Sequence, residues 1–108
     1  MKHFACHRFY ASADGCHSRC VVELADDGAF HTHFPLRGEI SHTRWLGGII
    51  FLSPHTGMER REGECFDAFL RRVAPSATAG ECPLYGWYVT HFDFSRHDFT
   101  ADSRVLRL

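Results

Sequence analysis

The sequence predicts an α+β fold: a mainly antiparallel β-sandwich or partly open barrel of about six strands with one helix, about residues 64–73. Two alternating runs flank an Asp-Asp-Gly turn, which is a strong signal for a β-hairpin. Apolar residues recur with helical spacing in one segment only. Ten phenylalanines among 108 residues favour strands and an aromatic core. This length predicts a single domain, 1–108, that can bury a hydrophobic core without help from disulfides or metal ions.

The hairpin is expected to join residues 17–25 to residues 29–36. A three-residue loop places Gly28 in the left-handed region, where glycine has no steric penalty, and pairs Leu24 with Phe30. A two-residue loop would mix the apolar and polar faces, because a one-residue shift turns every side chain over. The three-residue loop is therefore preferred.

Four further strands are expected at residues 2–10, 43–52, 84–94 and 99–108. The segment 43–52 is apolar on both faces, which is typical of a covered strand, and its two glycines indicate a bulge or a close backbone approach. The helix is supported by an apolar stripe at i, i+3, i+4 and i+7: Phe66, Phe69, Leu70 and Val73.

Two histidines of the second hairpin strand form the main metal candidate. Alternation along a strand places His31 and His33 on one face, about 7 Å apart from twice the rise per residue. The expected pairing puts Glu23 opposite His31, so that Glu23 would be a third ligand or an orienting group for zinc. The alternative is a solvated strand face, with no cofactor.

Three other sets of side chains have types used in metal binding or catalysis. They are Cys16 with Cys20 and His17, the loop residue Cys82, and His91 with Asp93 and His97. Each also has an ordinary structural interpretation as a core cysteine, a loop cysteine or a surface ion pair. The sequence contains no phosphate-binding glycine loop and no Gly-x-Ser-x-Gly motif.

Charge and cysteine content exclude several classes of function. The net charge is −1 and no basic run exists, which argues against a nucleic-acid partner. No apolar stretch reaches the length of a membrane span, and the first residues lack the apolar core of a signal peptide. Five cysteines without a signal peptide predict a reducing cytoplasm and mostly free thiols.

The aromatic segment 84–94 carries more large side chains than one strand face normally buries. Surplus aromatic surface is typical of an interface. The sequence therefore predicts a small non-enzymatic β-rich module that acts by binding or self-association, as a homodimer through Tyr85, Trp87 and Tyr88. The alternative function is a small metal-binding protein or enzyme centred on His31 and His33.

One part of the chain resembles the accessory N-terminal β-segment of amidohydrolases. The residues that carry the resemblance are 21–28, 34–36, Glu39 and 45–50. In that family a hairpin with a D-G turn leads to a W-L-P-G-x-I-D-x-H-x-H strand. Here Gly47 replaces the proline, Phe51 the aspartate and Ser53 the first metal histidine, and only His55 matches the second. The resemblance implies a similar β-module without the catalytic barrel, and therefore no hydrolase activity.

Overall fold

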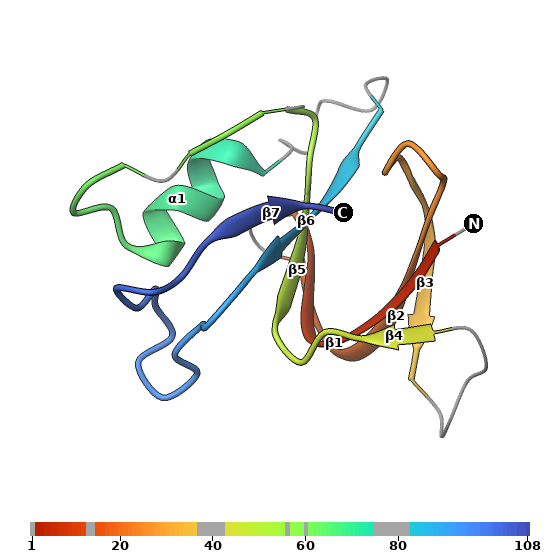
Figure 1. Cartoon of the computed structure of the whole chain (residues 1–108), viewed down its shortest axis with the longest axis horizontal. Coiled ribbons are helices and arrows are strands. Elements are labelled where there is room, and N and C mark those ends of the chain that lie inside the picture. Colours follow the sequence, from red (N-terminus) through yellow and green to blue (C-terminus); the bar gives the residue numbers. More distant parts are fainter. Residues whose placement is uncertain (1, 13–14, 37–42, 56, 60, 75–82) are drawn as a thin grey trace.

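The computed structural model describes residues 2–12, 15–36, 43–55, 57–59, 61–74 and 83–108. The described residues form seven strands and one helix, and the predicted α+β class is confirmed (Figure 1). The elements are β1 (Lys2–Ser12), β2 (Gly15–Leu24), β3 (Phe30–Pro35), β4 (Thr43–Trp45), β5 (Ile49–Ser53), α1 (Phe66–Val73), β6 (Tyr85–Val89) and β7 (Val105–Arg107).

The strands form one mixed sheet in the order β3-β2-β1-β5-β6-β7, with β4 also paired to β1. Four pairings are antiparallel, and β1 runs parallel to β4 and to β5. The long β1 thus spans two partners: its first half pairs with β4 and its second half with β5. In Figure 1 the strands β1 to β3 arc away from β5 and β6, and α1 lies on the opposite side. The sheet is strongly curved and does not close into a barrel.

All five residues of β5 are buried, because the strand is covered on both faces. Ile49 and Phe51 belong to a helix-side cluster, while Ile50 and Leu52 belong to an inner cluster. The helix-side cluster consists of Tyr10, Ile49, Phe51, Phe66, Phe69, Leu70, Val73, Trp87, Val89 and Phe92. The inner cluster consists of Cys6, Phe9, Cys20, Val22, Leu24, Ile50 and Leu52.

Helix α1 covers the first cluster with the apolar stripe that the sequence predicts. All four stripe residues are buried: Phe66, Phe69, Leu70 and Val73. The helix starts two residues later than predicted, at Phe66, whose backbone N–H donates to Asp98 Oδ1 at 2.8 Å. This bond satisfies one of the backbone donors that a helix N-terminus leaves without an intrahelical partner.

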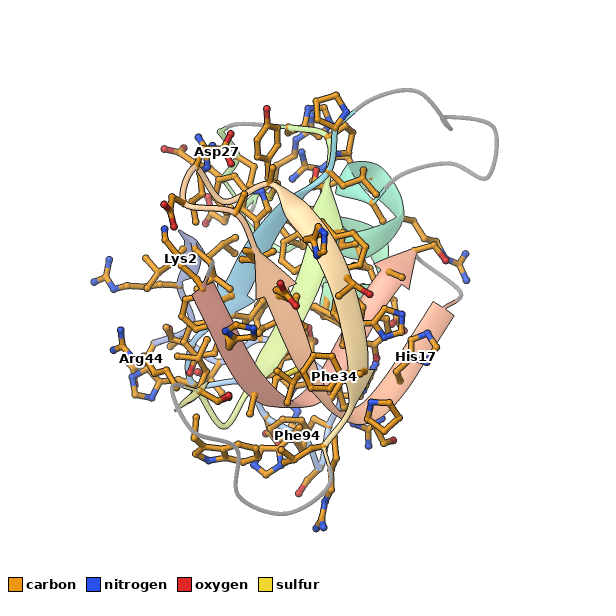
Figure 2. The ribbon with its side chains drawn as sticks, turned by 90° about the vertical axis from the view of Figure 1, so that its right-hand side faces the viewer. Lys2, His17, Asp27, Phe34, Arg44 and Phe94 are labelled. Atoms are coloured by element: carbon orange, nitrogen blue, oxygen red, sulfur yellow. The ribbon has the colours of Figure 1, made fainter. Side chains whose placement is uncertain are left out.

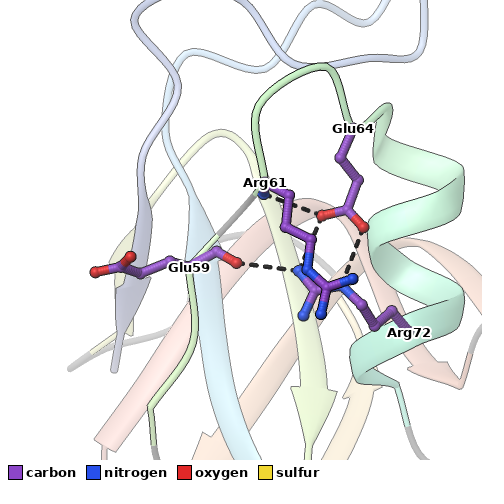
Figure 3. A network of polar contacts seen from close by, with 4 residues as sticks. All are labelled: Glu59, Arg61, Glu64 and Arg72. Atoms are coloured by element: carbon purple, nitrogen blue, oxygen red, sulfur yellow. Dashed lines mark hydrogen bonds and ion pairs between the residues drawn. The ribbon is translucent and has the colours of Figure 1, made fainter.

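A network of charged groups fastens the segment before α1 to the helix itself (Figure 3). The Arg72 guanidinium donates to both carboxylate oxygens of Glu64, at 3.0 and 2.9 Å, and to the backbone oxygen of Glu59. Glu64 also accepts the backbone N–H of Arg61. Hydrogen bonds from Arg72 lower the pKa of Glu64. Arg72 therefore fixes the segment that leads into the helix.

The curved half of the sheet covers the inner cluster. At one end of the curve the β2–β3 turn reaches β6: Ala29 forms an isolated bridge with Tyr85, and the Gly86 N–H donates to Gly28 O. The Phe30 N–H donates to Leu84 O at 2.7 Å. These bonds connect the β2–β3 turn to the start of β6, although β3 and β6 are not paired along their length.

Three of the expected strands are divided or clearly shortened in the structure. The expected strand 43–52 is two strands, because the chain turns at Gly47, where φ is +66°. The expected strand 84–94 ends at Val89, shortly before His91, which has a φ of +49°. The last strand is restricted to β7, and residues 99–104 contribute turns instead.

The predicted three-residue hairpin loop is confirmed. Gly28 has a φ of +89°, the Ala25 N–H donates to Ala29 O, and Leu24 pairs with Phe30. The register beyond that pair is wrong by one residue. Glu23 pairs with Thr32, so that His31 is the extra residue of a β-bulge.

We expect Gly28→Val to destabilise the protein by at least about 2 kcal/mol, because a β-branched residue is strained at positive φ. A Cβ at Gly28 would also lie 2.6 Å from Leu108 O. Gly63→Val is the matched control, since Gly63 has a φ of +75° but no atom within 4 Å of the added Cβ. Chemical denaturation should show the larger loss for Gly28→Val. Equal losses would contradict the close packing of the turn against the C-terminus.

Candidate binding face

The sheet is irregular where three neighbouring strands bend together. In β1 the backbone N–H groups of His7 and Arg8 both donate to Gly48 O, at 3.0 and 3.4 Å, instead of to successive carbonyls. On β2, Arg19 has a φ of +46°, which is uncommon for a residue with a side chain. On the other side Gly47 turns the chain between β4 and β5. The regular ladder is therefore interrupted at one place, where β1 changes partner.

Exposed aromatic rings gather at this bend. The His7 ring contacts Trp45 edge to face, with centroids 4.8 Å apart, and Phe94 in the same manner at 5.4 Å. Trp45 is 52% exposed and Phe94 is 37% exposed, which is unusual for side chains of this size. In Figure 2 Phe94 lies at the opposite end of the molecule from the turn that carries Asp27.

Two arginines lie beside these rings. Residues His7, Arg8, Ser18, Arg19 and Phe94 line a surface depression of about 300 Å³. The Arg8 guanidinium lies 5.9 Å from the centre of the Phe94 ring. Among the described residues no carboxylate forms an ion pair with either arginine.

We name the aromatic–arginine face as the surface formed by His7, Arg8, Ser18, Arg19, Trp45 and Phe94. It joins two arginines, which form no ion pair with a carboxylate of the described residues, to exposed, flat apolar groups. Trp and Arg are the residue types most enriched where binding energy concentrates at interfaces. The arrangement is suited to binding an anionic group that has an apolar neighbour.

Sequence reasoning missed this face because its residues are dispersed over four segments and follow no motif. A signal existed in the strand 43–52. Trp45 lies shortly before the glycine pair, where the chain bends between β4 and β5 although both strands run parallel to β1. The expectation of one continuous strand concealed that break.

The predicted metal ligands are not assembled. Glu23 lies between His31, at 3.5 Å, and His3, at 3.6 Å. His33 instead lies on the inner side, where its ring contacts Phe9. The expected common face of His31 and His33 is therefore wrong, because the bulge at His31 reverses the alternation. In the ranges that the structure describes, no three His, Cys, Asp or Glu side chains are grouped to hold a metal ion.

His33 lies in an apolar setting beside a second histidine. Its ring stacks near Phe30, and the His17 ring centroid is 4.7 Å from its own. Its Nδ1 is buried and has no hydrogen-bond partner among the described residues. Burial, and to a lesser degree the neighbouring His17, lowers the pKa of His33.

The aromatic residues predicted to form an interface contribute to the monomer. Trp87 is 4% exposed, and its indole N–H donates to His55 O. The Tyr88 hydroxyl donates to Leu46 O at 2.7 Å, and Tyr85 lies against the Arg107 guanidinium. Strand β6 has clusters on both of its faces, which accounts for its large side chains.

The remaining candidates are separated. Cys16 is exposed whereas Cys20 is buried, and Cys82 lies outside the described residues. The Asp93 carboxylate accepts the backbone N–H groups of Ser95 and Arg96 and so shapes its own turn.

His97 is 3.2 Å from the hydroxyl of the buried Tyr10 and 3.7 Å from Asp67. Burial, together with a hydrogen bond that the Tyr10 hydroxyl donates to Cys16, raises the pKa of Tyr10 to about 12.

A larger depression of about 570 Å³ lies between residues 61–65 and 98–101. Two of its charged groups, Glu64 and Asp98, already have partners. Glu64 pairs with Arg72, and Asp98 accepts the Phe66 N–H. The aromatic–arginine face, where the described residues include no carboxylate paired with the arginines, is therefore the stronger candidate.

Comparison of the chain with known protein families, with curated proteins and with solved structures finds no match. Within the part of the chain that the structure describes, the only helix is too short and too polar to cross a membrane.

We expect stability to fall as pH drops below about 6.5, the usual pKa of a histidine in an unfolded chain. Because the folded pKa of His33 is lower than that, the unfolded state binds more protons in acid and is favoured there. Denaturation at pH 5.5 and 7.5 measures the effect, and His33→Phe should make the loss smaller. His31→Gln, at an exposed ring, is the control and should leave the loss in place. Equal stability of the parent protein at both pH values would contradict the expectation.

Proposed function

We propose that this protein is a small non-enzymatic binding module whose aromatic–arginine face receives an acidic segment of a partner protein. The observation that carries the proposal is the depression lined by Arg8 and Arg19, next to exposed Trp45 and Phe94. Carboxylates of the partner would bind the guanidinium groups, and an adjacent apolar side chain would pack on the rings.

The openness of the site favours a polypeptide over an enclosed small molecule. His7, Ser18 and Arg19 on its rim are all exposed. Small-molecule pockets usually enclose most of their ligand, which this shallow surface does not do. A partner segment supplies its own cover and needs only a flat, charged contact area.

Charge complementarity favours an acidic partner over a nucleic acid. Two arginines and a histidine are a small local charge on a chain whose net charge is −1. Binding to a phosphate backbone normally uses a broader basic surface.

The resemblance of residues 21–28, 34–36, Glu39 and 45–50 to an accessory β-segment that carries no catalytic barrel supports a non-catalytic role. We also propose that the protein is located in the reducing cytoplasm, and this part of the proposal rests on its cysteine content.

The two tryptophans provide a direct test by nuclear magnetic resonance. Trp45 is exposed at the face, whereas the Trp87 indole N–H is bonded to His55 O in the core. A peptide with phenylalanine flanked by glutamates should shift the Trp45 indole signal and leave that of Trp87 in place. Arg8→Gln and Arg19→Asn should each weaken binding about tenfold, the loss of one charged hydrogen bond. Asparagine tolerates the positive φ at position 19.

Arg71→Gln is the matched control, because Arg71 is an exposed arginine on α1, away from the face. It should bind the peptide as the parent does. Equal binding of a lysine-flanked peptide, or unchanged affinity in both arginine variants, would contradict the proposal. Tighter binding of a short oligothymidylate would favour a nucleic-acid partner instead.

Self-association is the second candidate, and the edge of the sheet at β7 favours it. In the described sheet β7 pairs only with β6, and its residue Leu106 is 47% exposed. An open strand edge with an apolar side chain can pair with a second copy.

Light scattering at micromolar concentration should give the mass of two chains, and Leu106→Lys should return it to the mass of one. A monomer at all concentrations would remove this candidate without affecting the peptide result.

A further inference from the structure

Cys6 on β1 and Cys20 on β2 are direct cross-strand partners. Facing residues of antiparallel strands have Cα atoms about 4.5 or 5.5 Å apart, within the range that a disulfide spans. Both side chains belong to the inner cluster and therefore point to the same side of the sheet. The Cys6 thiol lies 3.7 Å from Cys20 O, and the Cys20 thiol lies 3.7 Å from Ser18 O.

We infer that Cys6 and Cys20 are a modification site at which a small-molecule disulfide, such as oxidised glutathione, forms a reversible intrachain disulfide. Rotation about the Cα–Cβ bond of Cys20 exchanges its weak S–H···O contact for the S–S bond. The described cysteines all have free thiols, so that both sulfurs are available for exchange.

The reaction balances through two exchange steps. The first cysteine thiolate attacks one sulfur of oxidised glutathione, which breaks that S–S bond and releases one glutathione thiolate. The second cysteine thiolate then attacks the protein-bound sulfur and releases the other glutathione thiolate. Two electrons pass from the two cysteines to the oxidant, and the two cysteine protons end on the two reduced glutathiones.

Burial of the two thiols slows their reaction with the oxidant. Desolvation is the main reason that the pKa of Cys6 rises to about 12, and it also raises the pKa of Cys20. Because the thiolate is the attacking species, oxidation of the folded protein is expected to be slow and to accelerate with pH.

The position of this pair gives the bond a consequence. Cys6 directly precedes His7, and Cys20 directly follows Arg19, so that the bond would fix the two strands where the regular ladder is interrupted. It would close a loop of about 15 residues, which restricts the unfolded chain. The oxidised protein should therefore have a higher denaturation midpoint than the reduced protein.

The test uses a variant in which Cys16, Cys65 and Cys82 are serine, so that only Cys6 and Cys20 remain. It is refolded from urea in a mixture of reduced and oxidised glutathione, which bypasses the slow entry of the oxidant into the folded protein. We expect mass spectrometry to show the loss of two hydrogen atoms and a peptide pair joined through Cys6 and Cys20. Dithiothreitol should restore both thiols and lower the denaturation midpoint.

The control retains only the exposed Cys16 and Cys65 and should give glutathione adducts instead of an intrachain bond. Adducts or free thiols at both Cys6 and Cys20 after refolding would overturn the inference. An unchanged or lower midpoint in the oxidised protein would overturn its stabilising role. Neither result depends on peptide binding at the aromatic–arginine face.

Discussion

The burial of β5 on both faces is the constraint on which the rest of the structure depends. Five consecutive buried residues require two covers, and the short chain has only one helix in its described part. Helix α1 supplies the first cover. The sheet supplies the second by curving over its own inner side, so that Phe9 and Leu24 pack against Ile50 and Leu52. Curvature of the sheet is thus a consequence of having one helix for two apolar faces.

A sheet that curves this sharply must interrupt its hydrogen-bond ladder somewhere. In this protein the interruption occurs where β1 passes from β4 to β5, at His7 and Arg8. Bulges change the direction in which side chains point, and they are frequent beside functional sites. The same bend that covers the inner cluster therefore leaves Trp45 and Phe94 in solvent next to arginines. The bend in the sheet therefore accounts both for the covered inner cluster and for the exposed binding face.

The parts of the fold that depend on local sequence were predictable. Gly28 determines the hairpin loop through its own backbone preference, and the stripe from Phe66 to Val73 determines the buried side of α1. The position of His31 was not predictable in the same way. With the bulge, Phe30 and His33 both contact Phe9, which is more than twenty positions away along the chain. The aromatic–arginine face was even harder to predict from the sequence, because its residues come from β1, β2, β4 and the turn after β6.

Two backbone irregularities, at Arg19 and at His31, also explain why some side chains point to the opposite face from the one that strand alternation predicts. Regular β2 geometry would place Cys16 and Cys20 on one face, yet Cys20 is in the inner cluster and Cys16 is exposed opposite Tyr10. The positive φ of Arg19 lies between them and reverses the alternation, as the bulge at His31 does on β3. Each reversal moves one group inward and its neighbour outward. An apolar environment then suppresses the charged form of the inward group, whether it is the cation of His33 or the thiolate of Cys20. The acid sensitivity and the slow thiol chemistry expected of this protein thus follow from backbone geometry at two positions.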